Sequence, residues 1–289
     1  MKKILVLLFL LTTCAGACTG AQPGMPPQEQ SAESDRTQDE TIPFLCKTVL
    51  LDAGHGFGDV GCSFWGGHVY EKDITPVLTQ KIGRALQARG VNVLYTHDGS
   101  ACPTKSQLDA LAEDLRYDLD GFLRGLIERY SGRTDEELQA TLDTFYGGIN
   151  ENDLFGVYER CYYANLLAQQ QEISLFVSVH VNANESCDTL TGFELFCCMD
   201  TPHADASGDA MLELQGALAY RFLQKETRIR AYGWNDAYVV TKYTDMPSVL
   251  IESGYATTPS DARELQDETW QNEFANAVAD GIVRYLTTE

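Results

Sequence analysis

Two histidines and two glutamates stand where the chain could assemble a metal-dependent hydrolytic site. His55, His180 and Glu252 each come at or just after the end of a short apolar run. Glu71 comes just before a helical pattern. Two histidines and a carboxylate are a usual ligand set for catalytic zinc, which leaves a fourth position for water. A second carboxylate can then act as a general base on that water.

The segments that carry these residues alternate between strand and helix patterns. Short apolar runs predict strands over six segments: 46–54, 91–97, 174–183, 191–198, 236–242 and 246–254. Apolar residues repeating on one face predict helices over 73–90, 152–171, 208–226 and 270–286. This alternation predicts an α/β fold with a mostly parallel, twisted central sheet and helices on both faces. Because ligands bind beyond the carboxyl ends of the strands in such sheets, we expect the four polar residues at one edge.

The stretch between the first strand and the first helix is rich in glycine. Gly54 and Gly56 flank His55 and permit a backbone turn, which predicts a hinge that aims the imidazole over the sheet. Asp73 is the predicted N-cap of the helix, and a carboxylate at Glu71 near that helix start is expected to stay ionised. The segment "GHGFGDVG" lacks the lysine of a P-loop and the GxGxxG spacing, which disfavours nucleotide binding.

Simpler structural roles compete with the catalytic interpretation. A lone histidine is more often a structural hydrogen-bonding residue, and a lone glutamate before a helix is more often a cap. The metal hypothesis therefore depends on all four residues meeting at one sheet edge. His68 is a rival ligand because it lies close in the sequence to the first helix. His97 and His203 are not among the residues expected to form the site, and Asp52 and Asp59 are interpreted as residues that shape the loop or support the ligands.

The first residues have the layout of an export signal. Residues 1–17 combine a basic start, an apolar stretch and small residues before Cys18, which predicts a signal peptide of the lipoprotein type. Cys18 is then the expected lipidation site, and its acyl chains would be the protein's attachment to a membrane. Residues 18–43 are rich in Pro, Gln, Ser and acidic residues and predict a flexible tether. We therefore expect an exported protein, anchored at the cell envelope, with its folded domain at 44–289.

The composition disfavours one class of partner, nucleic acid, and one class of metal site, a cysteine zinc cage. With 21 Lys and Arg against 42 Asp and Glu, the 289-residue chain carries a formal net charge of −21, which disfavours a nucleic-acid partner. Nine cysteines are present and none forms a CxxC pair, so a cysteine zinc cage is disfavoured. The odd number of cysteines beyond the tether leaves at least one thiol outside any intrachain disulfide, and the pairing stays open.

Several segments resemble the motifs of one family, the zinc-dependent N-acetylmuramoyl-L-alanine amidases of bacterial cell walls. They are "LLDAGHGFGDVGC", "YEKDITPVL", "ERCYYANLLA", "SLFVSVHVNA" with "GFELF", and "MPSVLIESGYATTPSDARELQ". Their order in the chain is the family order. The resemblance implies one Zn²⁺ on His55, Glu71 and His180, with Glu252 as the general base. It also implies that the substrate is peptidoglycan, cleaved at the amide between N-acetylmuramic acid and L-alanine of the stem peptide.

The chain departs from the family pattern at several points. His97 stands where the family usually has arginine, and Val181 stands where it usually has alanine. A strongly charged, helical insertion at about 100–150 exceeds the usual connection by about forty residues, and long insertions are often functional lids. We expect this insertion to be a surface decoration or a docking site for a regulatory protein. The alternative, by analogy with family members in which a helix blocks the zinc, is that residues 104–149 are autoinhibitory.

Two other functions stay open at the level of sequence. One is a zinc hydrolase of the same fold that acts on another amide or peptide. The other is a non-catalytic module that binds the cell wall and regulates other enzymes. The second of these predicts a lost ligand, and each of the four site residues is present.

Overall fold

The computed structural model describes four stretches of the chain, residues 47–118, 121–122, 156–232 and 238–288. The predicted signal peptide, the tether and Cys18 lie outside the described residues, as does most of the insertion at 100–150. Within the described stretches, no helix combines the length and the apolar character needed to cross a bilayer.

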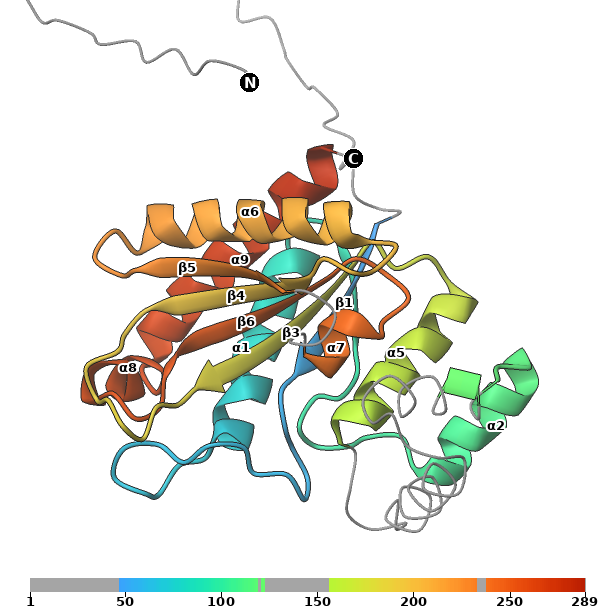
Figure 1. The fold of residues 1–289 in the computed structure, drawn as a ribbon, viewed down its shortest axis with the longest axis horizontal. Coiled ribbons are helices and arrows are strands. Elements are labelled where there is room, and N and C mark those ends of the chain that lie inside the picture. The colour runs from blue at the N-terminus through green and yellow to red at the C-terminus, as the bar shows by residue number, and fades with distance from the viewer. Residues whose placement is uncertain (1–46, 119–120, 123–155, 233–237, 289) are drawn as a thin grey trace, which may run out of the picture. The chain divides into compact units, whose positions relative to one another are not determined.

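The described residues form a six-stranded sheet with the strand order β2-β1-β3-β6-β4-β5 (Figure 1). The strands are β1 (Thr48–Ala53), β2 (Asn92–Tyr95), β3 (Leu175–Asn182), β4 (Phe193–Cys198), β5 (Thr227–Tyr232) and β6 (Ser248–Tyr255). Four of the neighbouring pairs are parallel, and β4 runs antiparallel to β6. The prediction of a mostly parallel sheet in an α/β fold is therefore confirmed.

Helices cover both faces of this sheet. One face packs against α1 (Glu71–Gln87), α6 (Ala204–Arg221) and α9 (Glu268–Thr288). The other face packs against α5 (Val157–Gln170) and α7 (Val239–Lys242). Figure 1 shows α7 in front of the sheet and α1 and α9 behind it. All residues of β1 and β6 are buried, because both of their faces are covered, and such strands read as near-continuous apolar runs.

Two short helices complete the described fold. Helix α8 (Pro259–Glu264) follows β6 directly. Helix α2 (Lys105–Leu115) packs against α5 through Leu108 and Leu166. Arg116 ends α2 by adopting a left-handed conformation with φ of 53°, so the helical pattern of the insertion is interrupted there.

At the far edge of the sheet, one sequence prediction is wrong and one strand was not predicted. Residues 236–242 were expected to form a strand, but Val239–Lys242 form helix α7. The β-branched valines favour a strand locally, whereas their packing against β4 and β6 selects the helix. The true edge strand is β5, whose sequence "TRIRAY" alternates charged with uncharged residues. An edge strand with one side in solvent has no continuous apolar run, so the pattern did not reveal it.

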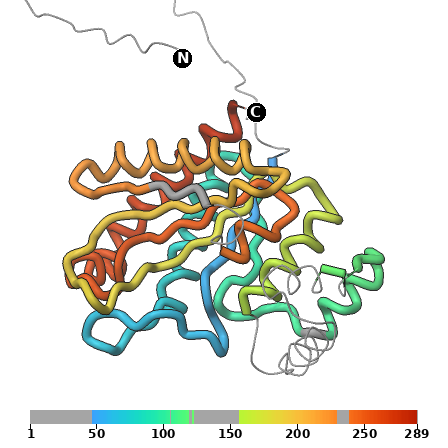
Figure 2. The backbone as a smooth tube through the Cα atoms, viewed as in Figure 1, coloured from blue at the N-terminus to red at the C-terminus, as the bar shows by residue number. Residues whose placement is uncertain are grey.

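Helix α1 begins earlier than the sequence indicates. Its first residue is Glu71, and Tyr70 is the N-cap in place of the predicted Asp73. Asp73 is instead the third helical residue, and its carboxylate accepts a hydrogen bond from the Tyr70 N–H at 3.0 Å. Glu71 therefore lies in the first turn, where the helix dipole favours a negative charge. Figure 2 follows the chain from β1, in blue, through the loop and into α1.

Candidate metal and active site

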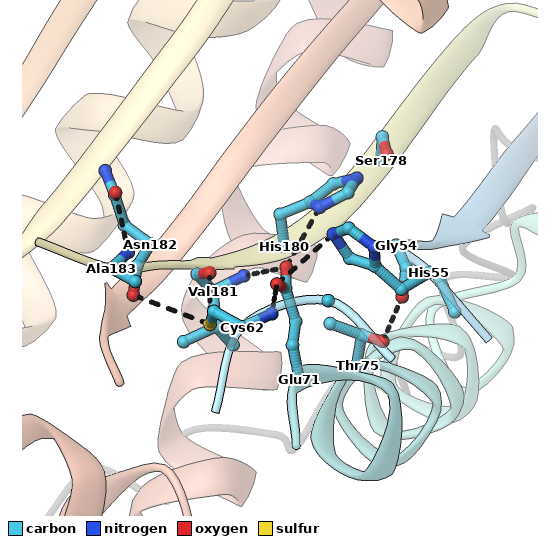
Figure 3. Close-up of polar contacts among 12 residues, drawn as sticks. Gly54, His55, Cys62, Glu71, Thr75, Ser178, His180, Val181, Asn182 and Ala183 are labelled. Carbon is cyan, nitrogen blue, oxygen red and sulfur yellow. Dashed lines mark hydrogen bonds and ion pairs between the residues drawn. The ribbon is translucent and has the colours of Figure 1, made fainter. Parts of the chain in front are cut away.

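Three of the predicted residues bring their donor atoms together at the carboxyl ends of β1 and β3. The donors of His55, Glu71 and His180 all lie within 4.8 Å of one another. Glu71 Oε1 is 3.0 Å from Nδ1 of His180, and Glu71 Oε2 is 3.2 Å from Nε2 of His55. Figure 3 shows the Glu71 carboxylate facing both imidazoles. Two nitrogens and one carboxylate at this spacing form a donor set that suits a single zinc ion.

His55 lies on the turn that the glycines predict, and Gly56 has the expected positive φ, but Gly54 has a different role. His55 itself adopts the left-handed region with φ of 62°, followed by Gly56 at 122° and Phe57 at 52°. A positive φ is strained for any residue other than glycine, and such strain is typical of functional sites. Gly54 is needed for space instead, because a Cβ there would lie 2.4 Å from the His180 ring.

Asp59 fixes the orientation of the His55 ring. Its Oδ2 lies 2.8 Å from Nδ1 of His55, and its Oδ1 accepts a hydrogen bond from the Gly61 N–H at 3.1 Å. A neutral imidazole carries one N–H, so donation from Nδ1 to Asp59 leaves the lone pair of Nε2 facing the Glu71 carboxylate. A carboxylate behind a histidine is a common support for a metal ligand. This arrangement fits a cation between His55 and Glu71.

Backbone N–H groups hold the Glu71 carboxylate from two sides. Val181 N–H donates to Oε1 at 2.8 Å, and Cys62 N–H donates to Oε2 at 3.1 Å. The Val181 N–H is available because the β3–β6 register shifts between His180 and Asn182, as in a β-bulge. Burial would raise the pKa of Glu71, but hydrogen bonds and charge from His180 and His55 outweigh burial and lower it. Glu71 is thus held ionised.

Gly61 gives the first testable consequence of this close packing. A Cβ at Gly61 would lie 2.6 Å from Glu71 Oε2 and 2.8 Å from Cδ2 of His55, and its φ is 64°. Gly61→Ala is therefore expected to displace both side chains and to weaken zinc binding by about 10–100-fold, the usual cost of disturbing the support of a ligand. Competition with a chromogenic chelator measures the affinity.

A matched control for Gly61→Ala exists on α6. A Cβ at Gly208 would meet no heavy atom within 4 Å, and alanine is favoured over glycine inside a helix. Gly208→Ala should leave zinc affinity unchanged. Wild-type affinity in Gly61→Ala would contradict the close approach that the structure shows.

Glu252 lies beside the three donors on the neighbouring strand. In the sheet register it is the partner of His180, and its side chain is buried. Its Oε2 has no hydrogen-bond partner among the described residues. Burial raises the pKa of Glu252, and the negative charges of Glu71 and Glu194 raise it further. A buried carboxylate without a partner at a cavity is a typical candidate for proton transfer.

A cavity of about 460 Å³ joins Glu252 to the three donors. Asp59 and the thiol-bearing Cys62 also line it, and Tyr238 and Leu250 contribute an apolar wall. Cys62 directs its sulfur to the Val181 carbonyl oxygen at 3.4 Å. The three donors and Glu252 therefore open onto the same cavity.

The remaining histidines lie apart from the donor cluster found among the described residues. His68 is exposed on the loop before α1, so the rival ligand hypothesis loses its support. His203 is at the N-cap position of α6. His97 is buried behind the His55 turn, and its Nε2 lies 2.8 Å from the Ala53 carbonyl oxygen.

Comparison with known proteins places this geometry in a family. The family model described as N-acetylmuramoyl-L-alanine amidase matches residues 49–120 and 131–284. The chain belongs to this family. The amidase resemblance and the expected hydrolase class are thereby confirmed.

Individual amidases agree with this assignment. The chain is 26% identical over 244 residues to the N-acetylmuramoyl-L-alanine amidase LytC of Bacillus subtilis (strain 168), covering 84% of this chain and 36% of LytC. It is 24% identical over 258 residues to the germination-specific N-acetylmuramoyl-L-alanine amidase of the same organism, covering 89% of this chain and 87% of that protein. The CwlD amidase from Clostridioides difficile, solved in complex with the GerS lipoprotein, has the same fold, with a TM-score of 0.57. It is 23% identical and covers 84% of this chain and 100% of the CwlD chain.

One buried ion pair beneath the amidase site was not predicted. Arg160 of α5 pairs with Asp52 of β1, and both side chains are almost fully buried. Asp52 also accepts hydrogen bonds from Ser178 and Thr96 hydroxyls, each at 2.6 Å. Arg160 lies in the motif "ERCYYANLLA", which carried the resemblance without a role for the arginine. The only sequence signal for this ion pair was a charged residue on the buried face of a helix. Its partner could not be identified, because it lies 108 residues away in the chain.

Proposed function

We propose that this chain is a zinc-dependent peptidoglycan hydrolase that cleaves the amide between N-acetylmuramic acid and L-alanine of the stem peptide. Membership of the amidase family supports the reaction class. The observation that carries the proposal is the convergence of the His55, Glu71 and His180 donors beside the unpartnered carboxylate oxygen of Glu252 in one cavity.

His55, Glu71 and His180 would hold one Zn²⁺ per chain. Their supporting contacts suit that role, because Asp59 orients one imidazole and two backbone N–H groups orient the carboxylate. Zinc bound there would polarise the scissile carbonyl and lower the pKa of a coordinated water to about 7.

Glu252 would move the proton in this reaction. As the water oxygen adds to the amide carbon, the Glu252 carboxylate accepts the proton that the water loses. When the C–N bond breaks, the protonated Glu252 returns that proton to the nitrogen of the leaving L-alanine. The buried Oε2, free of competing hydrogen bonds among the described residues, suits both halves of this exchange.

The proposed setting of the enzyme is supported by its relatives and by the sequence of its N-terminus. One relative, from Staphylococcus aureus, is named as a probable cell wall amidase, and this supports action outside the cytoplasm on peptidoglycan. We propose export by the signal at 1–17 and anchoring through a lipid on Cys18, both on the basis of sequence. The CwlD structure contains a lipoprotein partner, and a regulatory protein docked at the 100–150 insertion stays a proposal for this chain.

Mass spectrometry of digested peptidoglycan tests the reaction and its metal together. Wild-type protein is expected to release stem peptides that begin with L-alanine and to leave glycan strands intact. A chelator should abolish release, and added zinc should restore it. Cleavage within the peptide would point to another amide substrate, and binding of muropeptides without products would favour a non-catalytic module.

A further inference from the structure

Two backbone carbonyls immediately before His55 are held by side chains from two different elements. The Ala53 oxygen lies 2.8 Å from Nε2 of His97, which follows β2. The Gly54 oxygen accepts a hydrogen bond from the Thr75 hydroxyl of α1 at 2.6 Å. Figure 3 shows the Thr75 contact beside the His55 ring. Both side chains are buried, so neither contact competes with bulk water.

These contacts begin where the sheet ladder stops. The last β1–β2 bond runs from the Thr96 N–H to the Leu51 carbonyl at 3.0 Å. Two residues further along β1, the Ala53 carbonyl would accept the next N–H of a continued β2. The side chain of His97 contacts this carbonyl oxygen instead. A buried carbonyl left without a donor would be costly, so His97 extends the pairing of β1 up to the turn.

His97 also contacts the far side of the turn. Its Nδ1 accepts a hydrogen bond from the Gly99 N–H at 3.2 Å, so a single neutral tautomer with Nε2–H satisfies both ring nitrogens. Its ring packs edge-on against Phe57, and a Cβ on Gly56 would lie 3.0 Å from its Cε1. His97 thus touches residues before and after His55.

Thr75 connects the same turn to a second proposed ligand. It lies one helical turn after Glu71, so its hydroxyl sets the distance between the start of α1 and the end of β1. Serine and threonine hydroxyls in helices commonly bond to their own helix backbone, whereas this one crosses to another element.

We infer that Thr75 and His97 are positioning residues of the zinc site, which together hold the Ala53–Phe57 turn in the strained conformation that aims His55 at Glu71. We call this pair of contacts the carbonyl clamp. The inference rests on the proposed zinc site. It assigns a role to His97, one of the two residues named above that depart from the family pattern.

Thr75→Val is the sharpest test, because valine keeps the shape of threonine and removes the hydroxyl. We expect it to weaken zinc binding by about 10–100-fold, as measured by chelator competition. Thr75→Ser keeps the hydroxyl and should bind zinc within about threefold of wild type. Thr79→Val is the matched control, because Thr79 lies one turn further along α1, is buried, and has a hydroxyl with no partner among the described residues.

The His97 half of the clamp is tested in the same way. His97→Leu should weaken zinc binding as Thr75→Val does, and His97→Gln, whose amide can donate to the Ala53 oxygen, should recover part of the loss. Circular dichroism melts of the metal-free variants identify any that fail to fold. If Thr75→Val or His97→Leu fails to fold, the zinc affinities of Thr75→Ser and His97→Gln are compared with that of the wild type instead.

A metal-free readout separates the clamp from the proposed function. Ring signals of isotope-labelled histidines can be resolved by NMR, because the chain has five. Thr75→Val should shift or broaden the His55 signals of the metal-free protein, and Thr79→Val should not. Unchanged His55 signals and zinc affinity within threefold in both Thr75→Val and His97→Leu would overturn the clamp. Wild-type protein that binds zinc but releases no stem peptide would overturn the substrate instead, and the same titrations would still decide the clamp.

Discussion

Glu252→Gln is expected to lower kcat for release of stem peptides by about 10²–10⁴-fold, the usual contribution of a general acid–base group. Glutamine has the same shape but cannot accept the proton of the attacking water. The substitution removes a buried carboxylate whose Oε2 has no hydrogen-bond partner among the described residues, so it should leave folding intact. Initial rates are to be measured with saturating zinc, and zinc affinity should stay within about threefold of wild type, because Glu252 is absent from the donor cluster.

Glu159→Gln provides the control for this variant. Glu159 is another buried glutamate, on α5, and it is absent from the lining of the cavity. Neutralising it changes the charge of the protein in the same way without touching the proposed proton path. Full activity in Glu252→Gln would show that a different group accepts the proton. An equal loss of kcat in both variants would show that the loss comes from removing a buried carboxylate and not from the position of Glu252 beside the donors.

Arg160→Leu is expected to destabilise the metal-free protein by about 3–5 kcal/mol, the usual cost of breaking a buried ion pair from one side. The Asp52 carboxylate would be left with two neutral hydroxyl donors, from Ser178 and Thr96, and no opposing charge. Urea unfolding in the presence of a chelator measures this free energy without a contribution from bound metal.

The double variant Arg160→Leu with Asp52→Leu separates charge from packing. Replacing a whole buried ion pair by apolar residues is often close to neutral, so the double variant should be more stable than Arg160→Leu alone. If Arg160→Leu lowers the free energy of unfolding by less than about 1 kcal/mol, Asp52 is not effectively buried, because only exposed ion pairs contribute so little.

The strands that carry the site were predictable because they are covered on both faces. Burial of both faces favours the apolar runs at Val49–Leu51 of β1 and Val249–Ile251 of β6, and His55 and Glu252 come after these runs. The edge strand β5 and the short helix α7 were missed or misassigned, because tertiary packing and solvent exposure decided their form.

The contacts that hold the donor side chains in place could not be predicted from the sequence. Gly54 follows β1, yet the reason that it must be glycine is a ring on β3. The Thr75 hydroxyl bonds to a carbonyl 21 residues earlier, and nothing in the helical periodicity of α1 distinguishes it from Thr79. Periodicity identifies which residues are buried, whereas hydrogen bonds between distant elements depend on the register in which those elements meet.

The β1–β3 pairing has a consequence for the order in which the enzyme matures. His180 and Glu71 are 109 residues apart, and they come within reach only when β3 inserts beside β1 in the sheet. A nascent or partly folded chain that ends before β3 therefore offers two donors of the three, and it would hold a metal ion weakly. At the proposed zinc site, metal uptake would therefore be a late event, coupled to completion of the sheet centre.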